Sequence, residues 1–149
     1  MGRKTAHFLA IVLGAMAMVP AGAHLFSLAA KMGLAQEPYF TVQQIYRGWA
    51  LFGIAIFGAL FANIAVAVLV RRQPVAFRFS AAAAALITTM LVVFFVWTFP
   101  TNQATANWTT VPANWADLRT QWEYSHAASA IMTFAALCCS VLAQLTARD

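Results

Sequence analysis

The chain has 149 residues, of which 62% are hydrophobic and 9% are charged, and its mean hydropathy is +0.74. This composition excludes an ordinary water-soluble domain and indicates a membrane protein. The formal net charge of +5 does not indicate nucleic-acid binding, because no basic patch is interleaved with exposed aromatic residues.

Four mainly apolar stretches dominate the chain, at roughly residues 6–28, 46–70, 77–99 and 119–146. Each reaches the length of about 20 residues that a helix needs to cross a hydrocarbon core about 30 Å thick. The segments between the stretches are short, so residues 1–149 are expected to form a single domain. We predict an all-α bundle of four transmembrane helices that run up, down, up and down.

The first stretch follows a basic N-terminus and contains Ala21-Gly22-Ala23, which resembles a signal-peptide cleavage site. The apolar run continues past this site as far as Leu28. We therefore expect a retained first helix that carries His24 near its outer end.

The segment 31–44 is too polar to cross a membrane. Apolar residues from Tyr39 to Trp49 recur at helical spacing, so a short interfacial helix is predicted to start after Pro38. The second apolar stretch comes next and is rich in glycine and alanine. Small residues of this kind let membrane helices approach one another closely.

The third stretch is predicted to end at Phe99-Pro100. The following segment is rich in Thr and Asn and is expected to form a loop, with Asp117 as the N-cap of the fourth helix. The adjacent Cys138 and Cys139 lie deep in the fourth stretch and are expected to be apolar packing residues.

Basic residues divide unevenly between the two ends of the predicted bundle. Positive residues accumulate on the cytoplasmic side of short membrane loops. The inner end would hold Arg3, Lys4, Arg71, Arg72, Arg78 and Arg148, and the outer end would hold Lys31, Arg47 and Arg119. This split predicts that both termini are cytoplasmic in a multi-pass protein of the bacterial inner membrane, with the basic end near anionic lipids.

Aromatic and polar residues gather at the opposite, outer end. All five tryptophans fall there, namely Trp49, Trp97, Trp108, Trp115 and Trp122. An ordinary aromatic belt would occupy both membrane interfaces. The fourth stretch also carries a polar stripe on one helical face, made of Arg119, Trp122, Glu123, His126, Ser129 and Thr133. Ionisable groups at this depth usually face the bundle interior or a wet cavity.

An apolar bundle that ends in a polar and aromatic cup is the expected form of a small-molecule site. We predict that the main pocket opens toward the outer side and is lined by His24, Tyr46, Arg47, Trp97, Asn102, Trp115, Arg119, Trp122, Glu123 and His126. The candidate catalytic residues are Arg119, Glu123 and His126, and the others are candidates for substrate binding. In a purely structural interpretation, Arg119 and Glu123 form an ion pair, and His126 hydrogen-bonds a neighbouring helix.

Two kinds of chemistry fit this cup. Glu123 and His126 have the i,i+3 spacing of metal ligands in helical bundles, and His24 could supply a third ligand. A mononuclear copper or iron site therefore stays open, as does a haem between the two histidines, whereas two glutamates in the chain are too few for a di-iron centre. With no certain cofactor, His126 could instead remove a proton from a phenol or a carbon acid.

One set of residues resembles the signature of the small four-helix membrane proteins that include the fungal anthrone oxygenases: Pro100-Thr101-Asn102, Trp115, Leu118-Arg119, Trp122 and His126. The stretch from Gly22 to Gly53 is similar to bacterial members of this family. The resemblance implies a four-helix membrane bundle. For the fungal members it also implies oxidation of an anthrone to an anthraquinone by molecular oxygen without an obvious cofactor.

The resemblance further implies that His126 is the base, with Asn102, Arg119 and Trp122 shaping the site. This chain departs from the family pattern at Ser129, where an arginine would be expected. The departure bears on which substrate the site would accept.

The leading functional hypothesis is a small membrane oxygenase or oxidoreductase that acts on a lipid-soluble aromatic or quinone-like substrate. One alternative is a non-catalytic subunit or a lipid- or partner-binding membrane protein. Another is a copper-, iron- or haem-binding membrane protein. The expected partners are membrane lipids and a small apolar aromatic ligand, and a homo-oligomer or a larger membrane complex stays open.

Overall fold

A computed structural model describes residues 2–148, and the described chain is almost entirely helical. Four helical spans are long and apolar enough to cross a membrane: Arg3–Met32, Trp49–Leu69, Pro74–Ala104 and Trp115–Thr146. The prediction of an all-α protein with four such helices is confirmed. The first span is helix α1 (Arg3–Met32) and the last is α6 (Trp115–Thr146).

The two middle spans are composite. The second joins a 3₁₀ turn, Trp49–Leu51, to helix α3 (Phe52–Leu69). The third joins helix α4 (Pro74–Val93), a π-helical segment (Phe94–Thr98) and the short helix α5 (Phe99–Ala104).

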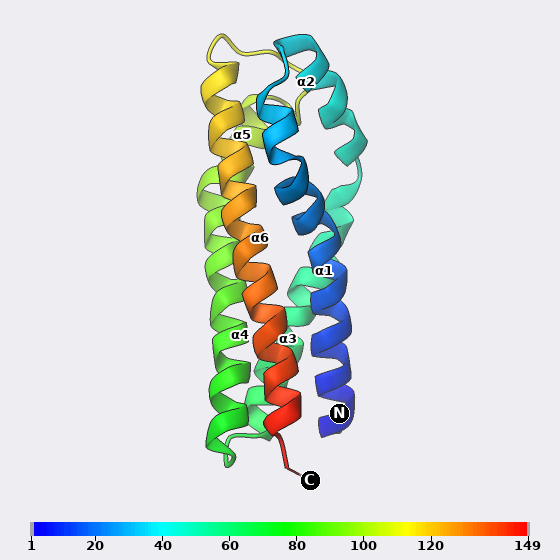
Figure 1. The fold of residues 1–149 in the computed structure, drawn as a ribbon, viewed down its shortest axis with the longest axis vertical. Helices are drawn as coiled ribbons and strands as arrows, with labels where there is room; N and C mark the ends of the chain where they lie inside the picture. Colours follow the sequence, from blue (N-terminus) through cyan, green and yellow to red (C-terminus); the bar gives the residue numbers. More distant parts are fainter. Residues whose placement is uncertain (1, 149) are drawn as a thin grey trace.

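The four long helices form an elongated bundle in which each one packs against two neighbours, in the ring order α1, α3, α4, α6. Consecutive helices run in opposite directions, so both ends of the chain lie at one end of the bundle (Figure 1). The helix α2 (Gln36–Gln43) and α5 lie at the other end. We call this other end, which carries the five tryptophans, the distal end.

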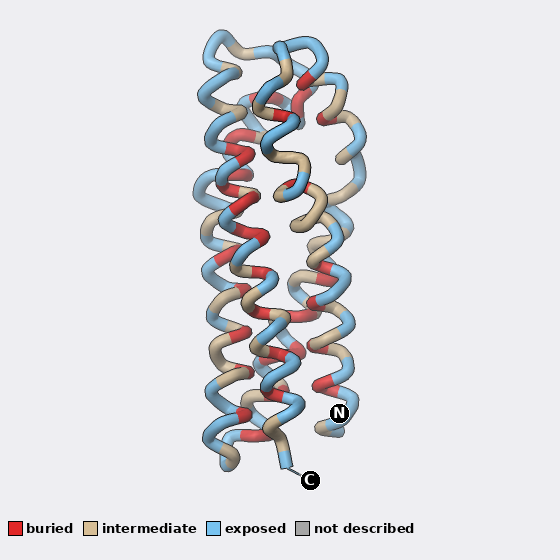
Figure 2. Tube along the Cα trace, in the orientation of Figure 1, coloured by how far each residue is buried: buried red, intermediate tan, exposed pale blue. Residues whose placement is uncertain are grey.

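Large apolar side chains point outward along the bundle, and small ones point inward. Phe26 and Ile54 are 88% and 75% exposed, whereas Ala59 and Ala83 are almost fully buried. The buried positions follow the inward faces of the helices (Figure 2). This arrangement suits a lipid environment, because apolar solvent around the bundle makes close packing of small residues the main source of helix association.

Gly58 lies at a close contact between α3 and α1. A Cβ atom at this position would lie 2.9 Å from Cδ1 of Leu13 on α1. The glycine- and alanine-rich composition of the second apolar stretch thus has the packing role that its sequence predicted.

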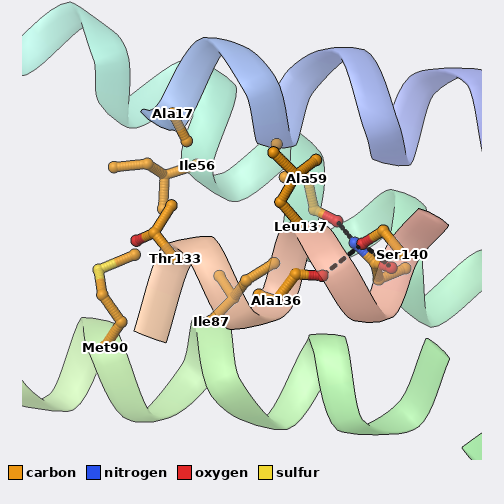
Figure 3. A pocket seen from close by; sticks show the side chains of 11 residues that line it. Ala17, Ile56, Ala59, Ile87, Met90, Thr133, Ala136, Leu137 and Ser140 are labelled. Atoms are coloured by element: carbon orange, nitrogen blue, oxygen red, sulfur yellow. Dashed lines mark hydrogen bonds between the residues drawn. The ribbon is translucent and has the colours of Figure 1, made fainter. Parts of the chain in front are cut away.

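The middle of the bundle contains one buried polar pair beside a small cavity (Figure 3). Ser140 donates a hydrogen bond to Oδ1 of Asn63 over 2.9 Å, and Nδ2 of Asn63 donates to the carbonyl of Ala59. The adjacent cavity, which Thr133 and Met90 also line, has a volume of about 10 Å³. This is at the lower limit for holding one water molecule.

Several predicted boundaries are wrong. The short interfacial helix α2 begins at Gln36, before Pro38, because proline is compatible with the first turn of a helix. Residues 46–48 do not extend the second span, since the chain turns at Gly48 with φ of +86°. The last helix begins at Trp115 after Asn114, so Asp117 lies inside its first turn and is not its N-cap.

The third span continues through Pro100 instead of ending there. Proline lacks the N–H that the α-helical pattern requires, and the preceding π-helical segment accommodates the change in hydrogen bonding. The carbonyl of Trp97 accepts hydrogen bonds from Nε2 of Gln121 at 2.9 Å and from Oγ1 of Thr101 at 3.0 Å. Side chains therefore satisfy a backbone group inside an interrupted membrane helix.

Candidate functional site

Two histidines from opposite ends of the sequence meet face to face at the distal end. The rings of His24 on α1 and His126 on α6 are stacked with centroids 3.9 Å apart and an interplanar angle of 24°. Trp122 presents its ring edge-on to both, at 4.9 Å and 4.3 Å. Tyr46 and Trp49 complete the group at 4.3 Å and 5.9 Å from His24. We call these five residues the histidine cluster.

A buried ion pair lies beside this cluster. Nζ of Lys31 on α1 is 2.8 Å from Oε2 of Glu123 on α6, and the two side chains are 3% and 0% exposed. The Lys31 ammonium also lies over the rings of Tyr46 and Trp122, 5.1 Å and 5.0 Å from their centroids. Burial makes such a pair costly to desolvate unless its geometry and hydrogen bonding are good.

The other carboxylate oxygen of Glu123 is also satisfied. Oε1 accepts a hydrogen bond from the Tyr39 hydroxyl at 2.9 Å and from Nε2 of Gln43 at 3.2 Å, both from α2. We call Lys31, Tyr39, Gln43 and Glu123 the Glu123 network. Both oxygens of the carboxylate therefore have a hydrogen-bond donor or a cation close by, and three neighbouring groups supply them.

Tyr39 is held in its neutral form. Burial raises the pKa of the Tyr39 phenol above its usual range, and the adjacent Glu123 carboxylate raises it further. The phenol therefore acts as a permanent hydrogen-bond donor to Glu123 at physiological pH.

Arg119 has a different partner from the one that the structural interpretation of the sequence assigned. Lys31 makes the ion pair of Glu123, whereas Nη1 of Arg119 donates to the carbonyl of Leu34 at 2.8 Å. The Arg119 guanidinium lies over the rings of Tyr39 and Trp115, at 5.5 Å and 4.8 Å. Arg119 thus fastens the turn between α1 and α2 to α6.

Asn102 contacts the cluster through one hydrogen bond. Its Oδ1 accepts from Nε1 of Trp122 at 2.7 Å, which fixes the indole that faces both histidines. The neighbouring Thr98 hydroxyl lies 2.8 Å from Oγ of Ser125. The third span therefore positions α6 and Trp122 but contributes no ring to the histidine stack.

Three predicted site residues lie away from the histidines. Trp97 is 46% exposed, and its carbonyl accepts hydrogen bonds from Gln121 and Thr101. Arg47 is exposed and donates to Oε1 of Gln44. Trp115 is half-buried and packs against Tyr39, so it belongs beside the Glu123 network.

Three members of the Glu123 network were missed from the sequence. Lys31 falls in the segment 31–44 that is too polar to cross a membrane, although it lies seven positions after His24 and hence on the same face of a continuous helix. Tyr39 and Gln43 are four positions apart and share one face of α2 in the same way. This spacing is the signal that could have found them.

The side chains at the predicted pocket are closely packed. Those of the histidine cluster contact one another directly, and two hollows lie elsewhere in the structure. One is the small cavity in the middle of the bundle (Figure 3). The other is an open hollow between α2 and the loop at 105–111, with a volume of about 400 Å³. We call the second one the distal hollow.

The geometry gives little support to metal binding. Among residues 2–148, no three His, Cys, Asp or Glu side chains come together as a group that could hold a metal ion. The two histidine rings are stacked plane on plane. In this arrangement their nitrogen atoms do not point at one another, so both rings could not ligate one iron atom between them.

Comparison of the chain with protein-family models, curated proteins and solved structures gives no match. Its description therefore rests on the residues themselves. They define an all-α protein with four helices able to cross a membrane, and with a buried histidine–aromatic cluster beside an ion pair at one end.

Proposed function

We propose that this chain is a multi-pass protein of the bacterial cytoplasmic membrane that oxidises a lipid-soluble aromatic or quinone-like substrate at the histidine cluster. Both termini would be cytoplasmic, and the distal end would face outward. The observation that supports the proposal is the stack of His24 on His126 against Trp122, with a charged pair buried beside it. Ionisable groups buried in a membrane bundle are costly and usually serve a function.

His126 is the base in this proposal. Oxidation of an activated methylene, R₂CH₂ + O₂ → R₂C=O + H₂O, begins when a base removes a proton from carbon. The resulting anion adds O₂ to give a peroxide anion, which takes the proton back from the protonated base. The hydroperoxide then loses water to leave the carbonyl. An imidazole is suited to the first step at neutral pH. The rings of Trp122 and Tyr46 offer flat apolar surfaces on which an aromatic substrate could stack.

Glu123 and Arg119 have supporting roles in this mechanism, in place of the catalytic roles first assigned to them. The Glu123 carboxylate is engaged by Lys31, Tyr39 and Gln43, so it has no free oxygen with which to accept a substrate proton. It holds Lys31 against the rings of the cluster. Arg119 holds the α1–α2 turn in place through the carbonyl of Leu34.

The resemblance to anthrone oxygenase-like proteins supports the same substrate class. Of the residues that carry the resemblance, Asn102, Trp122 and His126 form one continuous contact. The oxidation of an anthrone by O₂ is the reaction that this resemblance suggests for the chain.

A direct test uses purified protein in lipid nanodiscs with anthrone, an oxygen electrode and chromatography of the product. Substitution of the proposed base, His126→Ala, should lower turnover by roughly 100-fold or more. The matched control is His7→Ala, because His7 is a buried histidine of α1 at the other end of the bundle. Equal turnover in the two variants, or no turnover above the background of empty nanodiscs, would refute the proposal.

A non-catalytic role in a larger membrane complex is the second candidate, and the closed packing of the histidine cluster favours it. The rings of His24, Tyr46 and Trp122 pack directly against one another, and those of His24 and Trp122 also pack against His126. In that case a partner subunit should co-purify in stoichiometric amounts in mild detergent, and its recovery should survive His126→Ala.

A further inference from the structure

The distal hollow has the size and lining of a small-molecule site. Its volume of about 400 Å³ falls in the range of ligand pockets. Thr41 and Glu37 supply a hydroxyl and a carboxylate, and Phe40 and Trp108 supply apolar surface. The amide of Gln44, which also lines the hollow, is hydrogen-bonded to the carbonyls of Phe40 and Trp108 and to Arg47. Such a lining suits a flat apolar molecule that carries hydroxyl groups. No other acid or base shares the wall with Glu37.

Trp108 lies between this hollow and the histidine cluster. It lines the hollow, and its ring packs edge-on against Tyr39 at 5.1 Å and Trp122 at 5.6 Å. Trp122 in turn contacts both His24 and His126. Trp108 is only 3% exposed, so its side chain forms a wall between the hollow and the interior.

The backbone that carries this wall is strained. Ala106, Asn107 and Trp108 have φ angles of 46°, 54° and 63°, which form a left-handed turn of three consecutive residues, none of them glycine. For L-residues this conformation is unfavourable, and it persists only when surrounding contacts hold it. A displaced loop would be free of that strain.

Specific hydrogen bonds hold the strained loop closed. Nε2 of Gln44 donates to the carbonyl of Trp108 at 2.9 Å, and the backbone N–H of Trp108 donates to Oγ1 of Thr105 at 3.1 Å. The indole Nε1 of Trp108 is buried without a hydrogen-bond partner. A buried donor left in this state is unfavourable, and an oxygen atom of a bound ligand would satisfy it.

From these observations we infer that the distal hollow is the entry site for an uncharged hydroxylated aromatic molecule and that Trp108 is the movable wall through which it reaches the histidine cluster. The identity of this molecule as the substrate rests on the proposed function. The entry site can be tested separately, because binding and the rate of binding are measured without turnover.

The experiment measures the association rate of 2-naphthol with the full chain in nanodiscs, by stopped-flow quenching of tryptophan fluorescence. Gln44→Ala removes the bond that holds Trp108, so association should become roughly three- to tenfold faster. Ala106→Gly relieves strain in the closed loop without altering the lining, so association should become a few-fold slower. The control is Gln73→Ala, because Gln73 donates a similar bond to the carbonyl of Arg148 at the other end of the bundle.

Backbone hydrogen exchange provides a second measurement of the same motion. The amides of Thr109 and Thr110 both donate to the carbonyl of Thr105 when the loop is closed. Their exchange should be faster in Gln44→Ala and slower in Ala106→Gly, with no change in Gln73→Ala. This readout also shows that each variant is folded.

Rates that change in opposite directions in Gln44→Ala and Ala106→Gly support the inference. Equal association rates in all variants, or no binding of 2-naphthol to the unchanged protein, would overturn it. The proposed function fails separately, because turnover that survives His126→Ala refutes the base but leaves these association rates unaffected.

Discussion

The ammonium of Lys31 and the carboxylate of Glu123 lie 2.8 Å apart, on two different helices that are long and apolar enough to cross a membrane, with almost no exposed surface. The pair joins α1 to α6 at the level where the histidines stack. Its hydrogen bonds to Tyr39 and Gln43 also attach α2 to the bundle. The distal end is thus held by a polar network, whereas the other parts of the bundle are held mainly by small apolar residues.

Removal of one member of this pair should be strongly destabilising, because it leaves the other charge buried and unpaired. We expect Lys31→Met or Glu123→Gln to lower the free energy of unfolding by about 3–5 kcal/mol. The double variant Lys31→Met/Glu123→Gln should recover much of this loss. Unfolding of the purified protein in mixed detergent micelles measures the effect.

Lys4→Met is the matched control for this prediction, because Lys4 is an exposed lysine of the same helix. It should leave the free energy of unfolding nearly unchanged. If the double variant were as unstable as the sum of the two single variants, the two charges would not be coupled in the way the structure indicates.

Tyr39 provides a prediction on pH dependence. The pKa of its phenol is higher in the folded chain than in the unfolded chain, because burial and Glu123 disfavour the phenolate. The stabilisation from Tyr39 is therefore complete below about pH 10 and declines as the pH rises above that value, where the unfolded phenol loses its proton first. Tyr39→Phe should be less stable at neutral pH, and its stability should fall less steeply above pH 10.

An ultraviolet titration at 295 nm checks the same point in the folded state. Because Tyr39 stays protonated, the phenolate absorbance of the folded protein up to about pH 11 should be the same with and without Tyr39→Phe. A smaller absorbance in the variant would mean that Tyr39 ionises in the fold.

Gln121 should stabilise the π-helical segment. Its Nε2 donates to the carbonyl of Trp97 and to Oγ1 of Thr101, so Gln121→Ala leaves a backbone carbonyl with one donor fewer. We expect a loss of roughly 1 kcal/mol in the free energy of unfolding. Gln144→Ala, at an exposed position of the same helix, is the control and should have little effect.

Hydropathy alone was sufficient to predict the four long helices, because the length and apolarity of a membrane helix are set by the bilayer and not by its neighbours. The convergence of His24, Trp122 and His126 could also be predicted from the sequence. In a bundle of antiparallel helices, residues at equal distance from the same boundary come to the same level, and polar residues at that level turn inward.

The parts of the site that could not be predicted depend on where helices end and how they are phased. Lys31 lies in the site because α1 continues about one turn beyond the apolar run. A residue outside the predicted span is therefore on the inward face of the helix. Trp97 lies outside the site because the π-helical segment rotates its side chain away from the direction that an α-helical pattern predicts. The close packing of the rings at the expected pocket is a tertiary feature that no spacing in the sequence expresses.

The proposed orientation can be tested by cysteine labelling from outside the cell, in a background of Cys138→Ala and Cys139→Ala. Gln36 and Thr110 are exposed at the distal end, and Arg72 is exposed in the connection between α3 and α4 at the other end. If the termini are cytoplasmic, a membrane-impermeant maleimide should label Gln36→Cys and Thr110→Cys in intact spheroplasts. It should label Arg72→Cys only after permeabilisation, because the basic end is retained on the inner side. Labelling of Arg72→Cys alone in intact spheroplasts would reverse the orientation and place the histidine cluster and the distal hollow on the cytoplasmic side.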